Sequence, residues 1–264
     1  MAEELNRNSI APEDDAIAAG AQVTGSMRTI AVMDRTTFAD LASHPADVCV
    51  TIYLTTHGSG VEVNEQTDKK ALKDALSEAR RSMEELKIEG IIDDILRPAE
   101  QLLKDDGFWH HQTHGLALFL APDTHSCCLL PYDPGSMVHV HTAFILLPLV
   151  PILVDPWSAE QRRKAFQNKA DQGAAPVTTF LQDVIRAAYE GRIAQLFVAK
   201  GQLVWGHYTD KPEEPVMHKQ EEPGDDCLTN QAVVQTILHG GEAYMVDQDK
   251  MPAGGEMAAV LRYS

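Results

Sequence analysis

Short β-rich runs alternate along this chain with segments whose apolar residues recur at helical spacing, and this alternation constrains the fold most. The run Val48–Leu54 is rich in β-branched residues, and the segment Gln66–Leu86 that follows it carries one apolar stripe of helical period. The stripe consists of Leu72, Ala75, Leu76, Ala79, Met83 and Leu86. Strands and amphipathic helices bury their apolar faces only against further layers, so the pattern predicts a mixed α/β (α+β) fold.

The remainder of the first half continues this pattern. Ile91–Leu103 has the apolar side of a second helix, and three strand-like runs follow it at residues 115–120, 126–132 and 137–147. The apolar run Ala143–Val154 contains two prolines, and we interpret it as a buried strand and its exit. At 12 residues it is too short to cross a bilayer, which takes about 20, so no membrane partner is expected.

A domain boundary is predicted near residue 155, because Ser158 and Gln161 form a capping-box pattern at the head of a polar helix. Beyond it, two short strands around Lys200-Gly201 predict a β-hairpin. A helix at residues 228–238 and strands at 243–246 and 257–263 complete a small α/β/α sandwich. The predicted division is therefore a mobile leader (1–27), an N-terminal α/β domain (28–154) and a C-terminal α/β/α sandwich domain (155–264).

The charge balance restricts the partners. The chain has 39 acidic and 22 basic residues, a formal charge of −17, and no basic run that could neutralise a phosphate backbone. We therefore expect no DNA partner, and a basic protein suits the chain better than bare RNA. The acidic start lacks the pattern of a secretory signal, and the four cysteines lack the spacing of a metal knuckle. A cytoplasmic protein with reduced cysteines is expected.

Two short segments hold the candidate binding residues. In the first, His110 and His114 would share a face if helical, but the run contains no acidic residue and leads into a strand. A polar sheet edge is therefore favoured over a metal site. The second is a basic cluster that either contacts RNA or is an ordinary solvated helix face. No catalytic residue, metal or cofactor is predicted, and the candidates are Trp109, His110, His111, His114, Arg162, Arg163 and Lys164.

Several segments follow one another in an order that resembles a known family. They include Val50–Thr56, Phe108–Gln112, Gly115–Leu120, Leu147–Pro151, Ala187–Ile193, Gly240–Tyr244 and Leu261–Tyr263. In this order they are similar to the bacterial relatives of the archaeo-eukaryotic translation release factors, the baeRF group. The resemblance covers nearly everything after residue 47, and it implies a last domain like the C-terminal domain of those factors.

The resemblance also points to a missing part. Family members typically have a middle domain whose Gly-Gly-Gln-type loop carries release chemistry, whereas this chain has no Gly-Gly-Gln, and Gly240-Gly-Glu242 falls within the last-domain pattern. The resemblance thus implies a non-catalytic binding or regulatory protein related to translation release and ribosome-rescue factors. Its partner would be the ribosome, a ribosome-associated basic protein or a structured RNA. Two alternatives stay open: a hydrolase of peptidyl-tRNA or another nucleic-acid ester that uses the His110–His114 region, and a structural homo-oligomer.

Overall fold

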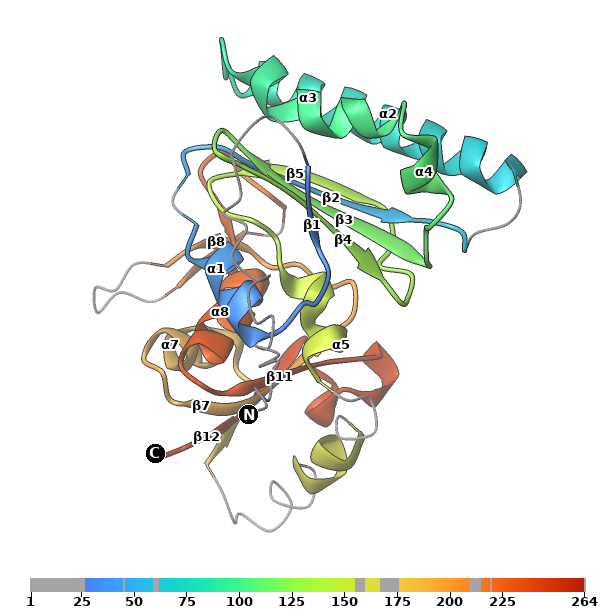
Figure 1. Ribbon diagram of the computed structural model, residues 1–264. Helices are drawn as coiled ribbons and strands as arrows, with labels where there is room; N and C mark the ends of the chain where they lie inside the picture. The colour runs from blue at the N-terminus through green and yellow to red at the C-terminus, as the bar shows by residue number, and fades with distance from the viewer. Residues whose placement is uncertain are drawn as a thin grey trace, which may run out of the picture.

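The computed structural model describes residues 27–44, 46–58, 62–154, 160–166, 176–208, 215–218 and 220–263. Nearly all of the predicted leader, and the predicted boundary near residue 155, lie outside these residues. Within them the chain is a mixed α/β protein, as the sequence pattern predicts (Figure 1). No helix in these ranges is long and apolar enough to span a membrane.

A five-stranded sheet, sheet A, forms the centre of the first half, with the strand order β1-β4-β3-β2-β5. Its strands are β1 (Arg28–Ile30), β2 (Cys49–Thr55), β3 (Gly115–Ala121), β4 (Thr124–Leu130) and β5 (Met137–His141). All pairs are antiparallel except β1 with β4. The two central strands, β2 and β3, are buried on both faces, which explains why their sequences are nearly continuous apolar runs.

Helices α2 (Glu62–Glu85), α3 (Ile92–Leu102) and the short α4 (Asp106–Trp109) cover one face of sheet A (Figure 1). The predicted apolar stripe of α2 is buried from Leu72 to Met83, which confirms this part of the prediction. Its last member, Leu86, is 55% exposed. The reason is local: the helix ends at Glu85, and Lys87 takes a left-handed conformation with φ 59°, which turns the chain away from the stripe.

The other face of sheet A is covered by α1 (Arg35–Ala42), by a 3₁₀ turn at Leu147–Leu149 with α5 (Val150–Leu153), and by α8 (Leu228–Leu238) (Figure 1). The run Ala143–Val154 was predicted to be a buried strand and its exit, and this is wrong, because β5 ends at His141 and helical turns occupy Leu147–Leu153. Pro148 and Pro151 stand at the starts of the two helical turns, where a missing N–H costs nothing.

A second sheet, sheet B, has the order β11-β7-β12-β6. Its strands are β6 (Val177–Thr178), β7 (Ile193–Ala199), β11 (Glu242–Val246) and β12 (Met257–Leu261). Alternation along β7 sends Leu196 and Val198 into the same apolar cluster as α7 (Leu181–Tyr189) and α8, and sends Phe197 against Phe166 of the helix at residues 160–166. Helical segments therefore lie on both faces of sheet B.

The predicted hairpin around Lys200-Gly201 is wrong. β7 already has β11 on one edge and β12 on the other, so no edge remains for the strand that follows it. That strand, β8 (Trp205–His207), instead joins a three-stranded sheet with β9 (Val216–His218) and β10 (Asp226–Cys227). Gly206 is required there because a Cβ at this position would lie 1.9 Å from the Val216 carbonyl oxygen.

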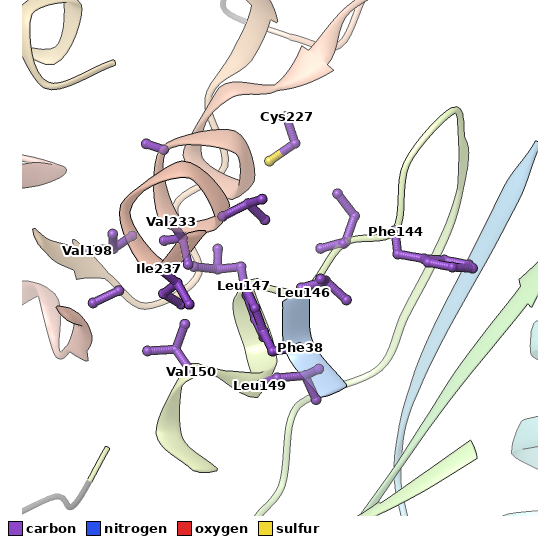
Figure 2. Close-up of a cluster of buried hydrophobic side chains, with 14 of the residues drawn as sticks. Phe38, Phe144, Leu146, Leu147, Leu149, Val150, Val198, Cys227, Val233 and Ile237 are labelled. Atoms are coloured by element: carbon purple, nitrogen blue, oxygen red, sulfur yellow. The ribbon is translucent and has the colours of Figure 1, made fainter. Parts of the chain in front are cut away.

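One apolar cluster joins the two halves of the chain. Figure 2 shows Phe38 of α1 and Leu147 and Val150 gathered beside Val233 and Ile237 of α8, and all five belong to the same buried cluster. The core that stabilises sheet A on this face therefore continues into the packing of sheet B.

The side chain of Asn230 in α8 provides polar contacts across the same seam. Its oxygen accepts hydrogen bonds from the N–H groups of Leu146 and Leu147 at 2.8 and 3.1 Å, and its nitrogen donates to the Phe144 carbonyl at 3.1 Å. Because one buried amide satisfies three backbone groups, it fixes the apolar segment 144–147 to the start of α8.

Candidate functional site

Trp109 is a core residue. Its side chain is 1% exposed, its indole N–H donates to the Leu102 carbonyl at 2.6 Å, and its ring meets Phe108 edge-on. The short α4 that carries it begins at Asp105, whose carboxylate accepts from the Phe108 N–H. The indole of Trp109 thus anchors the segment to the core, and the structure leaves none of its faces exposed to a ligand.

His110, His111 and His114 are all exposed and follow directly from this anchor. The His111 ring bonds the Gly107 carbonyl at 2.8 Å, and the His114 carbonyl accepts from the Thr56 N–H at 3.2 Å. Within the described ranges no group of three or more His, Cys, Asp or Glu side chains is arranged to hold a metal ion. The described residues thus give these histidines no metal site.

The structure adds a histidine–aspartate pair at this sheet end, which the sequence analysis missed. His57 follows β2, and its ring Nδ1 lies 2.7 Å from Oδ1 of Asp68 in the first turns of α2. The other carboxylate oxygen accepts from the His57 backbone N–H at 2.9 Å, so Asp68 binds both the ring and the backbone of His57. The Asp68 side chain is 2% exposed and the His57 side chain 47%. A buried carboxylate that orients a half-exposed imidazole leaves Nε2 as the ring atom available for chemistry or binding.

A turn after β4 closes the same sheet end. Asp133 accepts from the Thr55 hydroxyl at 2.6 Å and from the Gly135 N–H, and these bonds, with His57 nearby, lower the pKa of its carboxyl. The turn passes so close to Gly115 that a Cβ there would lie 2.4 Å from the Pro134 ring. We call the group His57, Asp68, His114 and Asp133 the sheet-end site.

Part of this site has a signal in the sequence. Asp68 stands four residues before Leu72, on the apolar stripe of α2, where a carboxylate is unexpected unless it is paired. His57 has no comparable signal, because its partner lies 11 residues away across a loop.

None of the four cysteines is suited to act as a nucleophile at the sheet-end site. All four are buried, and burial raises the pKa of Cys49 and Cys227 to about 12 and that of Cys128 to about 11. Buried thiols with raised pKa values are inert near neutral pH. The chemistry that the sheet-end site can offer is therefore that of an oriented imidazole base.

The basic cluster lies apart from the histidines, on the helix at residues 160–166. Glu160 forms a two-pronged ion pair with Arg163, both distances 2.9 Å, and contacts Lys164 at 3.4 Å. These bonds lower the pKa of Glu160 to about 2. Arg162 turns toward Glu242 of β11, with Nε 3.8 Å from the carboxylate. Acidic neighbours thus offset much of the positive charge predicted for this helix.

Comparison with known proteins adds little. No family model matches the chain, and no curated protein is similar to it in sequence. A solved structure described as "Archaeal protein" aligns with 88% of this chain and 99% of its own length, at 10% identity and a TM-score of 0.29. A likeness at this TM-score carries no argument about fold or function.

Proposed function

We propose that the protein is a non-catalytic binding protein, related to translation release and ribosome-rescue factors, whose partner is a basic protein of the ribosome or associated with it. The relation to those factors rests on the ordered sequence segments quoted above. The choice of a basic protein rests on one structural observation, the compensation of Arg163 and Lys164 by Glu160.

The charges of the helix at residues 160–166 and of the whole chain both favour a basic protein over a nucleic acid. A surface that binds a phosphate backbone needs several cations free to displace counterions. Here the cationic helix carries its own carboxylate, and the chain as a whole has a formal charge of −17. Opposite charge steers association and sets its salt dependence, so a basic protein surface is the better complement.

Co-sedimentation of the purified protein with ribosomes at low and moderate salt tests this proposal. We expect co-sedimentation at low salt that falls as salt screens the charges. The double variant Asp74→Lys/Glu78→Lys alters two exposed residues of α2, and Asp40→Lys/Asp47→Lys is its charge-matched control. If only the Asp74→Lys/Glu78→Lys variant fails to co-sediment, the contact lies on α2. If both double variants fail, long-range attraction is responsible. Absence from ribosomes at the lowest salt would overturn the proposal.

A second candidate function is a hydrolase of peptidyl-tRNA or another nucleic-acid ester, and the sheet-end site favours it. The buried Asp68 fixes the His57 ring as an oriented base, and the His110–His114 segment lies at the same end of the sheet. An imidazole oriented by a carboxylate is the arrangement used to activate a hydroxyl or a water.

Turnover of a peptidyl-tRNA substrate decides between the two functions. If the protein is a hydrolase, His57→Ala should reduce the rate by about 100-fold or more, the usual contribution of a general base. His114→Ala tests the predicted region, and His239→Ala, an exposed histidine just after α8 whose ring bonds the Gln235 carbonyl, is the control. If the wild-type protein shows no turnover, the proposed hydrolase function is contradicted.

A further inference from the structure

A hollow of about 380 Å³ lies at one end of sheet B, where three distant parts of the chain meet. Arg35 comes from the start of α1, Gln195 and Glu242 from β7 and β11, and Arg262 from the end of β12, and Gly240 also lines the hollow. The volume is within the range of small-molecule sites, roughly 300–1,000 Å³.

Two guanidinium groups at this hollow are held in place by backbone carbonyls. Arg35 donates to the Gly241 carbonyl at 3.0 Å, and Arg262 donates to those of Gly191 and His239 at 3.1 and 2.7 Å. A guanidinium has five N–H donors, so these bonds leave most donors of Arg35, and several of Arg262, for another acceptor. Fixed orientation also reduces the entropy that a ligand would otherwise cost these side chains.

One carboxylate, that of Glu242, lines the hollow, and a third arginine lies beside it. Glu242 accepts from the Tyr244 hydroxyl at 2.7 Å and from the Gln195 amide at 3.4 Å, and Arg162 approaches the same carboxylate at 3.8 Å. The two arginines and one glutamate of the lining give a formal charge of +1, and Arg162, which lies outside the lining and contacts Glu242, raises the local sum to +2 in a chain whose total is −17. Arg35 and Arg262 thus bond carbonyls of the turns that follow α7 and α8, whereas Arg162 contacts a carboxylate and bonds no carbonyl in the described part of the chain.

We propose that this arginine hollow, lined by Arg35, Arg262 and Glu242 with Arg162 beside Glu242, is a binding site for the phosphoryl group of a small phosphate monoester. The charge of +2 matches a phosphate dianion, and planar guanidinium groups bind phosphate oxygens in pairs. A single phosphoryl group fits an isolated hollow in an otherwise acidic protein, whereas a continuous nucleic-acid backbone would need a longer cationic surface.

Calorimetric titration with inorganic phosphate and with a nucleoside monophosphate, at constant ionic strength set by chloride, tests the site. We expect saturable binding of both, weakened about tenfold by Arg35→Gln and by Arg162→Gln, since each removes a charge-assisted hydrogen-bond donor. The Arg162 side chain is half-exposed and bonds no backbone carbonyl in the described part of the chain, so its variant removes charge without removing a backbone contact there. Glu242→Gln should have the opposite effect and tighten binding several-fold. Arg97→Gln, which removes an exposed arginine of α3 that pairs with Asp94, should bind as the wild type does.

The outcomes separate the sources of the phosphoryl group. A short RNA with a 5′-phosphate that binds no better than the same RNA without it supports a free monoester as the ligand. Tighter binding of the phosphorylated RNA than of the monophosphate would overturn that assignment in favour of a nucleic-acid end. Absence of saturable binding at millimolar phosphate, or equal binding by all the variants, would overturn the site itself.

Discussion

Single buried polar residues fix much of the local structure of this protein. Asp68 holds His57 at one sheet end, and Asn230 holds the segment 144–147. His139 of β5 is a further case, with a ring stacked on His141 and packed against Trp205 of β8. Its Nε2 is buried and has no hydrogen-bond partner in the described part of the chain. A buried neutral imidazole of this kind is sensitive to acid.

We predict that His139 makes the fold acid-sensitive between pH 6.5 and 4. Burial, with the neighbouring His141, lowers its pKa from 6.5 to about 4. Between these values the unfolded chain binds the proton and the folded chain does not, so stability falls as the pH falls, by about 3 kcal/mol in total. Urea unfolding across this range should show a smaller loss for His139→Phe. The control His111→Gln, at an exposed position, should lose as much free energy of unfolding as the wild type does. If the free energy of unfolding falls equally with pH in the wild type and both variants, the prediction is contradicted.

At the scale of elements, hydrophobic periodicity explains which segments form and neighbouring strands explain where they pair. The stripe of α2 predicts the helix because its apolar spacing is a local property of the sequence. The misassigned hairpin after β7 shows the limit, because strand pairing depends on which edges are already occupied by β11 and β12. The same limit explains why the third sheet, β10-β8-β9, was not anticipated.

The pairing of β8 with β9 gives a prediction about glycine. Gly206 has φ 149°, and a Cβ there would meet the Val216 carbonyl oxygen at 1.9 Å, a backbone atom that cannot rotate away. We expect Gly206→Ala to lower the free energy of unfolding by more than about 2 kcal/mol and to speed amide exchange in β8 and β9. Gly201→Ala is the matched control: it has φ 75° but open space around the new Cβ, so it should cost only about 1–2 kcal/mol. Equal costs would show that the close approach to β9 is not what requires glycine.

On the scale of the whole molecule, the two halves share one buried cluster. Phe38, Leu147 and Val150 belong to the first half, and Val233 and Ile237 belong to the second. Burial on this shared surface is lost if either half unfolds, so we expect the halves to unfold together. The arginine hollow depends on the same arrangement, because Arg35 reaches Gly241 from 206 residues away in the sequence.

Asn230→Ala tests this coupling. The substitution leaves two N–H groups and one carbonyl of the segment 144–147 buried without a partner, which should lower the free energy of unfolding by about 3 kcal/mol or more. Denaturant unfolding should remain a single transition that moves to lower concentration, whether followed by Trp fluorescence or by circular dichroism. Gln182→Ala, on the exposed side of α7, is the control and should change little. Two separated transitions in the wild type would contradict the coupling.

The sequence by itself determined the mixed α/β class, the course of α2, α3 and α8, and most strands, because periodicity and turn residues act over a few positions. Only the tertiary structure decided which residues meet. It buried Trp109, paired His57 with Asp68, placed Glu160 beside Arg163, and brought Arg35 and Arg262 to one hollow. These contacts depend on the packing of layers far apart in the chain, and no local pattern encodes the distance between their side chains.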